Sequence, residues 1–229
     1  MGRRSAGRAT TERERSAQLS EEEILDAALR LTRRVGLDQL TMRQLADELG
    51  VTPMAAYYYV PNKEALLQLV ADSVLAEVDV PAGLPWDDHL RALADRLVKA
   101  VSTYPGLGAY LVANPMVPGA YRLTEGVLRA LVEGGFDDRE AILAHATVYT
   151  YLLGRLGLEA RLRGRPRHLS AVRRKDKDLP LLQRVGEQTA KLRASDYLHA
   201  GLETIIAGLH ASRSDRDRDD RGGSNGRKE

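Results

Sequence analysis

Apolar residues recur every three to four positions along most of the chain, and strand-type alternation is scarce. The clearest helical segment is 20–36, where Ser20 and Glu23 have the spacing of a capping box and Gly36 supplies a stop signal. Its apolar positions form one stripe: Ile24, Ala27, Ala28, Leu31 and Val35. This pattern predicts an all-α protein.

Three more helices are expected before residue 79. One starts after Thr41 and ends at Gly50, and the next begins at once, with Thr52 as its N-cap and Pro53 in its first position. Asn62 has the position of an N-cap for the third, and the stretch "PAGLP" then interrupts the helical pattern around residue 83.

The remaining helices are separated by proline and glycine signals, and two of them, 137–164 and 195–211, are apolar on more than one side. A helix of this kind is usually buried on two sides. We therefore expect a homodimer in which these two helices and their mates form a four-helix bundle. A deeply buried helix pair inside a monomer is the alternative.

Both ends of the chain read as charged tails with little apolar content. We expect 1–19 to be a disordered basic tail, which could also serve as an arm on DNA, and 212–229 to be a disordered charged tail. The basic segment 161–177 is expected to be a solvated loop, with a second DNA contact as the alternative.

Composition removes several classes of function. The chain has no cysteine, which excludes disulfides and thiol chemistry, and its net charge of +2 does not by itself indicate nucleic acid. Without a signal peptide or an apolar span, it is expected to be cytoplasmic and without a membrane partner. The five histidines lack metal-binding spacing, and no serine elbow or phosphate loop occurs. We expect no enzyme, no catalytic residue and no cofactor; a membrane-surface or protein-interaction module is the minor alternative.

The two short helices joined by "GV" are typical of a helix-turn-helix motif. Ala46 leaves room for a close crossing and Gly50 permits the tight turn, so that the second helix would enter the major groove of DNA. Thr52, Met54 and Ala55 then face base edges, whereas the tyrosine hydroxyls at 57–59 and Lys63 suit phosphates. Arg43 is placed to reach a guanine or a phosphate.

The stretch "LTMRQLADELGVTPMAAYYYVPNKEALL", residues 40–67, resembles the DNA-binding domain of the tetracycline-repressor (TetR) family. The resemblance covers residues 20–78 well, and the stretches "YPGLGAYLVANP" and "LVEGGF" extend it more loosely to the rest of the chain. It implies an N-terminal three-helix helix-turn-helix DNA-binding domain, 20–78 with its motif at 41–60. A larger helical ligand-binding and dimerisation domain, 79–211, would follow.

The resemblance also implies the DNA-binding residues: Thr41, Arg43, Thr52, Pro53, Met54, Ala55, Tyr57, Tyr58, Tyr59 and Lys63. The alternatives are a core position for Tyr57 or Tyr59, a solvated Arg43, and a Lys63 that pairs with a carboxylate. Of the three tyrosines, we expect Tyr57 and Tyr58 to be the exposed pair. Ala56 stands where the family usually has a larger aliphatic residue, so a tyrosine or Met54 is expected to fill that volume.

A sensor domain of this type holds a largely apolar ligand cavity. The candidates for its lining, each of which could instead be a core residue, are Trp86, His89, Tyr104, Tyr110, Asn114, Met116, His145, Tyr149 and Tyr151. Tetracycline-binding relatives use a histidine to hold a magnesium–drug complex, and at the matching place this chain has Tyr110. We therefore expect a metal-free, apolar or aromatic inducer. The combined prediction is a homodimeric repressor that leaves a palindromic operator when the inducer binds, with activation as the alternative.

Overall fold

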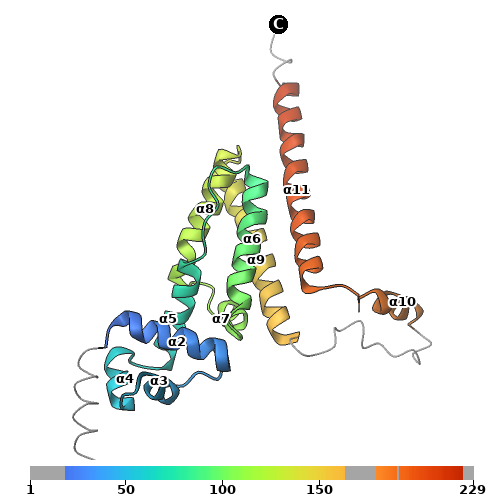
Figure 1. Cartoon of the computed structure of the whole chain (residues 1–229). Coiled ribbons are helices and arrows are strands. Elements are labelled where there is room, and N and C mark those ends of the chain that lie inside the picture. Colours follow the sequence, from blue (N-terminus) through green and yellow to red (C-terminus); the bar gives the residue numbers. More distant parts are fainter. Residues whose placement is uncertain (1–18, 163–178, 190, 224–229) are drawn as a thin grey trace, which may run out of the picture. The chain divides into compact units, whose positions relative to one another are not determined.

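The computed structural model of the chain describes residues 19–162, 179–189 and 191–223, and it contains helices but no strand among them (Figure 1). This confirms the all-α prediction. The helices are α2 (Glu21–Val35), α3 (Met42–Leu49), α4 (Pro53–Tyr59), α5 (Lys63–Ala76), α6 (Trp86–Ser102), α7 (Leu107–Ala113), the 3₁₀ turn η1 (Pro118–Ala120), α8 (Tyr121–Glu133), α9 (Asp138–Leu162), α10 (Pro180–Thr189) and α11 (Ala194–Gly223).

The predicted ends of α2 are present in the structure. The Ser20 hydroxyl accepts a hydrogen bond from the Glu23 amide at 3.1 Å, and the Glu23 carboxylate accepts one from the Ser20 amide at 2.9 Å. Gly36 ends the helix at φ +88°, a backbone conformation that glycine adopts without steric cost. The capping box predicted from the spacing of Ser20 and Glu23 is confirmed.

The helix-turn-helix boundaries also follow the predicted signals. Thr41, Thr52 and Asn62 each accept a hydrogen bond from a backbone amide in the first turn of α3, α4 and α5. Gly50 has left-handed geometry at the end of α3, where a side chain would be strained. Gln44 adds a second capping box with Thr41, which the Thr-x-x-Gln spacing could have predicted.

An ion-pair cluster ties α2 to α3. Arg30 and Arg34 on α2 both bind the Glu48 carboxylate, at 3.2 and 2.9 Å. Their hydrogen bonds, that of Arg34 first, hold the pKa of Glu48 below its ordinary value. Leu45 and Ala46 on α3 are fully buried, so the small residue at 46 permits the close packing that the sequence predicted.

The chain divides into two compact units. Their limits differ from the single domain boundary near residue 79 that the sequence predicted. The first unit contains the helix-turn-helix region up to Val80 together with Leu93–Glu125, and the second contains Pro81–Ala92 and the chain from Gly126 onward. Part of the expected ligand-binding domain, from the middle of α6 to the start of α8, therefore belongs to the same compact unit as α2 to α5.

Within the second unit α9 packs against α11. Leu152 and Leu156 on α9 are buried, as are Leu198, Leu202 and Ile206 on α11. Among the described residues, none of the helices combines the length and the apolar character that crossing a membrane requires.

Helix α11 corrects one prediction, because it continues to Gly223 instead of ending near residue 211. After Gly208 the next glycine or proline residues are Gly222 and Gly223, so the charged segment between them contains neither of the strong helix breakers. The expected disordered tail is wrong for residues 212–223. The predicted tail 1–19, except for its last residue, and most of the basic segment 161–177 lie outside the described residues.

Candidate DNA-binding surface

Helix α4 presents apolar and aromatic side chains to solvent. Met54 is 80% exposed, Tyr58 84% and Tyr57 46%. Thr52 and Pro53 at its start are also exposed, whereas Ala55 and Tyr59 are half-buried. The spacing of three and four residues puts Met54, Tyr57 and Tyr58 on one side of the helix. We call these three residues the α4 patch.

The packing behind the α4 patch differs in one respect from the expectation. Ala56 is buried with 2% exposure, but Met54 points to solvent and does not fill the volume beside it. The rings of Tyr58 and Tyr59 meet edge to face, with centroids 5.2 Å apart. Since Tyr59 is the less exposed of the two, this contact supports the orientation of Tyr58 at the surface.

Two cations were predicted to contact DNA. Arg43 on α3 is exposed and makes no hydrogen bond or ion pair with any other described residue. Lys63, at the first position of α5, donates to the backbone carbonyl of Asp38 at 3.0 Å. The partner of Lys63 is thus a carbonyl and not the carboxylate of the alternative interpretation.

Several contacts connect the DNA-binding helices to residues 104–106 in the same compact unit. The Arg33 guanidinium on α2 donates to the Tyr104 hydroxyl at 2.6 Å and lies 4.9 Å from the centroid of its ring. The backbone amide of Leu37 donates to the carbonyl of Pro105 at 2.7 Å. Gly106 has φ +88°, and a Cβ there would approach the backbone of Asp38 within 3.3 Å. The end of α2 therefore packs directly against residues 104–106.

Helix α5 is held at its C-terminal end by the same unit. The Asp72 carboxylate accepts a hydrogen bond from the Gly119 amide at 2.8 Å, and a Cβ at position 119 would lie 2.4 Å from the Asp72 carbonyl oxygen. Arg122 donates to the carbonyls of Ala76 and Val78. A guanidinium is a favourable partner for carbonyl groups at a helix C-terminus, where the helix dipole is negative.

Near its N-terminus, α5 makes a weaker contact with α7. The Tyr110 hydroxyl lies 3.4 Å from the Glu64 carboxylate, close to the outer limit of a hydrogen bond. Partial burial and then the nearby charge of Glu64 raise the pKa of Tyr110.

The predicted ligand-binding residues are divided between the two units. Tyr104 is buried, Tyr110 and Asn114 are half-buried, and Met116 is 75% exposed, all in the first unit. The second unit contains Trp86, His89, His145, Tyr149 and Tyr151. The structure therefore groups the candidates as two separate sets.

Within the second set, Trp86 packs against other aromatic rings, and burial shifts the pKa values of His145 and Tyr149. Trp86 contacts Phe136 and His210, with ring centroids 5.1 and 4.5 Å apart, so it is a core residue. His145 and Tyr149 stack on α9 with centroids 5.7 Å apart. Burial lowers the pKa of His145 and raises that of Tyr149.

A cavity of about 580 Å³ lies between α9 and the start of α11 in the second unit. Of the expected ligand-binding residues it includes Tyr151, whose hydroxyl donates to the carbonyl of Leu198 at 3.0 Å. The other lining residues were not predicted, among them Arg155, which lies over the ring of Tyr197 and pairs with Glu159. Within the described ranges no cluster of three or more metal-binding side chains occurs.

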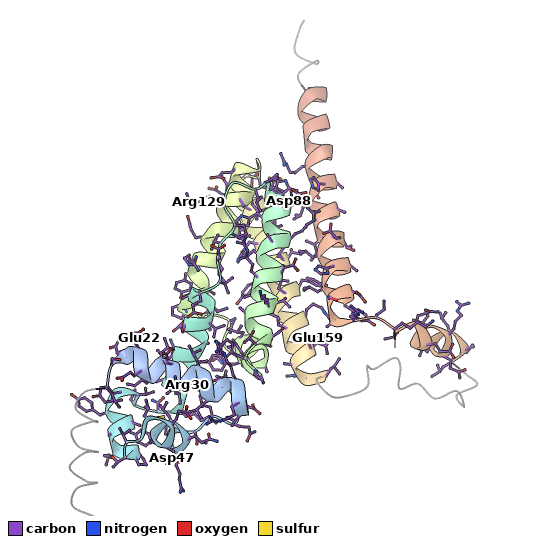
Figure 2. The ribbon with its side chains drawn as sticks, in the orientation of Figure 1. Glu22, Arg30, Asp47, Asp88, Arg129 and Glu159 are labelled. Atoms are coloured by element: carbon purple, nitrogen blue, oxygen red, sulfur yellow. The ribbon has the colours of Figure 1, made fainter. Side chains whose placement is uncertain are left out.

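Figure 2 draws the side chains of the described residues, with Arg30 on α2 and Asp47 on α3 labelled in the helix-turn-helix region. Residues 24–70 of this region match the family model described as "Bacterial regulatory proteins, tetR family". Residues 81–213 match the model described as "Tetracyclin repressor-like, C-terminal domain", which spans more than half of the chain. The chain belongs to the TetR family. It is a DNA-binding transcriptional regulator and not an enzyme.

Curated relatives agree with this assignment. The class D tetracycline repressor protein of Escherichia coli is 34% identical over 207 residues, which cover 84% of this chain and 90% of that protein. An HTH-type transcriptional regulator of Saccharopolyspora erythraea is 32% identical over 145 residues, but this alignment covers only 62% of this chain and 61% of the relative.

Solved TetR-family structures have the same fold. The Streptomyces coelicolor protein ActR in complex with actinorhodin superposes with a TM-score of 0.71 and 28% identity, over 86% of this chain and 97% of ActR. BioQ with its double-stranded DNA operator gives a TM-score of 0.63 and 25% identity, over 85% of this chain and 99% of BioQ. Relatives of this chain thus include one structure with a small molecule and one with operator DNA.

Proposed function

We propose that this TetR-family regulator is a homodimeric repressor that binds a palindromic operator and leaves it when a small-molecule inducer binds. Residues 20–78 form its DNA-binding domain, with the motif at 41–60, and residues 79–211 sense the inducer and join the protomers. Two relatives support this assignment by their names alone, a tetracycline repressor and an operator-bound regulator.

The exposed α4 patch supports operator binding, as does Arg43, which has no partner within the described part of the chain. The patch follows a tight glycine turn, as a recognition helix does, and its side chains project from the protein instead of filling its core. Thr52, Pro53 and Ala55 line the start of the same helix, and Lys63 is near the end of it. A two-fold dimer would then read two half-sites about one DNA turn, or a multiple of it, apart.

Dimerisation is supported by apolar surface that α9 leaves uncovered. Ile142 is 59% exposed, Leu143 53% and Leu158 45%, and a Cβ at Gly154 or at Gly208 on α11 would meet no atom within 4 Å. Open small residues beside exposed aliphatic ones suit close helix packing against a second copy. We assign the dimer to α9 and α11, in the predicted segments 137–164 and 195–211.

Changing Gly154 to Glu tests this dimer. A charge buried without a partner at the interface costs roughly 3 kcal/mol or more, so the dissociation constant should rise on the order of 100-fold. Sedimentation equilibrium measures the change, and Ala82→Glu, at an exposed loop position, is the control for an added charge. A wild-type monomer at all concentrations, or a dimer unaffected by Gly154→Glu, would contradict the assignment.

The observation that carries the inducer mechanism is the contact set between α2, α5 and residues 104–119. An inducer that engages the hydroxyl of Tyr104 or Tyr110 competes with Arg33 on α2 or with Glu64 on α5. Loss of these bonds would free the first and fourth helices of the expected DNA-binding domain, here α2 and α5. Only an inducer with different affinities for the two states shifts their populations.

We propose an apolar or aromatic inducer that needs no metal. Titration of the protein–operator complex with tetracycline, in EDTA and in excess Mg²⁺, tests this property. A sub-micromolar affinity that requires Mg²⁺ would overturn the metal-free assignment. Sequencing the genomic fragments that the purified protein selects tests operator recognition, and the absence of any enriched palindrome would contradict the proposed function.

A further inference from the structure

The sulfur atoms of this chain are all in methionine. The chain has no cysteine, so it offers no thiol to an oxidant, and it has four methionines. Met54 is 80% exposed and Met116 is 75% exposed, whereas Met42 is buried with 5% exposure. Met1 lies outside the described residues. Because a peroxide must reach the thioether to oxidise it, Met54 and Met116 are the accessible sulfur sites of the described chain.

Met54 is the accessible methionine that lies on the candidate DNA-binding surface. It is the second residue of α4 and belongs to the α4 patch with Tyr57 and Tyr58. Met116 belongs to the same compact unit but lies outside α2 to α5. A change in the polarity of Met54 would therefore alter the surface that meets DNA, and Met116 provides an internal comparison at almost the same exposure.

The fold of α4 does not depend on the side chain of Met54. Ala56 and Val60 are buried and anchor the helix. The hydroxyl of Thr52 caps the first turn, where it accepts a hydrogen bond from the Ala55 amide at 3.2 Å. Since most of the Met54 side chain contacts solvent, its oxidation should change the surface and leave the helix in place. An effect on DNA binding can then be separated from unfolding.

The chemistry is a two-electron oxidation of a thioether by a peroxide. The sulfur attacks one oxygen of hydrogen peroxide, so that an S–O bond forms and the O–O bond breaks. The proton of the transferred oxygen passes to the departing hydroxide, which leaves as water. Sulfur is oxidised to the sulfoxide and the peroxide is reduced. Methionine sulfoxide reductases return the sulfoxide to the thioether, so the modification is reversible.

We propose that Met54 is a reversible oxidation site at which peroxides weaken operator binding. This inference rests on the proposed operator recognition. Oxidation converts an apolar side chain into one with a polar S–O group, whose oxygen carries a partial negative charge. Burying this group against DNA removes its water, and the anionic phosphates repel its oxygen. Bound operator would in turn cover the sulfur, so DNA should protect Met54 from the oxidant.

The test uses the full-length protein, hydrogen peroxide, and an operator selected from random-sequence duplex DNA. Peptide mass spectrometry should find one added oxygen on Met54 and on Met116 and none on Met42. Fluorescence anisotropy should then show an operator affinity reduced roughly tenfold, at an unchanged melting temperature. Methionine sulfoxide reductases should restore the affinity. When operator is bound during oxidation, Met54 should react more slowly, whereas Met116 should react as before.

Three variants assign the effect to one sulfur atom. Met54→Leu keeps an apolar side chain without sulfur, so peroxide should leave its operator affinity at the value measured before treatment. Met116→Leu is the matched control, and its affinity should still fall on oxidation. Met54→Gln puts a polar side chain at the same position and should bind operator weakly before any oxidation.

The outcomes distinguish this inference from the proposed function. If no operator is selected, the proposed function fails and the oxidation site fails with it. If an operator is bound equally well after complete oxidation of Met54, or if peroxide weakens Met54→Leu as much as the wild type, the oxidation site alone is overturned. It is also overturned if Met54 reacts no faster than Met42, or if the reductases do not restore binding.

Discussion

The hydrogen bond between Arg33 and Tyr104 is predicted to stabilise the first compact unit measurably. Tyr104 is 5% exposed, and its hydroxyl accepts from the guanidinium at 2.6 Å. Hydrogen bonds to charged groups contribute roughly 1.5–3 kcal/mol, and we take the lower end because Arg33 is exposed and water can replace its partner. Tyr104→Phe, which keeps the ring beneath the guanidinium, should therefore cost about 1–1.5 kcal/mol.

The measurement is urea unfolding followed by circular dichroism at one fixed protein concentration, since dimerisation would otherwise shift the midpoint. A double-mutant cycle with Arg33→Ala isolates the pair, and its coupling energy should be about 1 kcal/mol. Tyr110→Phe is the matched control, because its hydroxyl lies 3.4 Å from Glu64 and should contribute less than about 0.5 kcal/mol. Additive effects of Tyr104→Phe and Arg33→Ala within about 0.3 kcal/mol would refute the reasoning.

Three further predictions concern other contacts. Gly119→Ala should destabilise the protein by about 1–3 kcal/mol in thermal unfolding, because its Cβ would lie 2.4 Å from the Asp72 carbonyl oxygen; an unchanged midpoint would contradict this. The pKa of Glu48 is lowered in the folded state by Arg34 and Arg30, so its contribution to stability should be present above its ordinary pKa of 4.5 and decline as the pH falls further. Urea midpoints of Glu48→Gln should thus lie below those of the wild type at pH 7 and approach them under acid conditions, whereas a constant gap would exclude the titration. If the Tyr58 hydroxyl binds a phosphate, Tyr58→Phe should weaken binding to operator and to unrelated DNA by the same factor, roughly 3–10-fold. A binding titration in which the variant and the wild type have equal affinities would show that the hydroxyl does not contribute.

The helix boundaries of the DNA-binding region could be predicted because their signals are local. Each of the four N-cap side chains accepts a hydrogen bond from an amide three residues further on; these residues are Ser20, Thr41, Thr52 and Asn62. Gly50 adopts the left-handed conformation that ends α3, in which a residue with a side chain would be strained. Such interactions depend on neighbouring residues and not on the tertiary fold. Tyr57 and Tyr58 were also predicted correctly as the exposed tyrosines of α4.

Contacts between distant segments could not be predicted in this way. Arg33 and Tyr104 are 71 positions apart, and neither residue has a local signal for the other. Tyr104 was considered as a ligand contact, and the structure adds a bond from its hydroxyl to α2 that the sequence did not indicate. Trp86 was another ligand candidate, and its packing on Phe136 was not predicted either. An aromatic residue in an apolar pattern does not reveal whether it faces a cavity or a neighbouring helix.

The predicted end of α11 was wrong for a different reason. Charged, low-complexity sequence was taken as a sign of disorder, although the stretch after Gly208 contains no residue that breaks a helix before Gly222. A helix that has already started adds residues at little cost, since nucleation is the expensive step. Composition therefore predicted the polarity of residues 212–223 correctly and their backbone conformation wrongly.

The packing of Leu93–Glu125 with the DNA-binding helices also has a consequence for engineering. A hybrid regulator joined at residue 80 would take its sensor from another protein and lose Tyr104, Gly119 and Arg122. The transferred DNA-binding segment would then lack the groups that contact the end of α2 and bind the C-terminal carbonyls of α5. A functional exchange should instead transfer the discontinuous module, residues 20–80 with 93–125. Of its three junctions, one follows residue 80 and the other two lie inside helices α6 and α8.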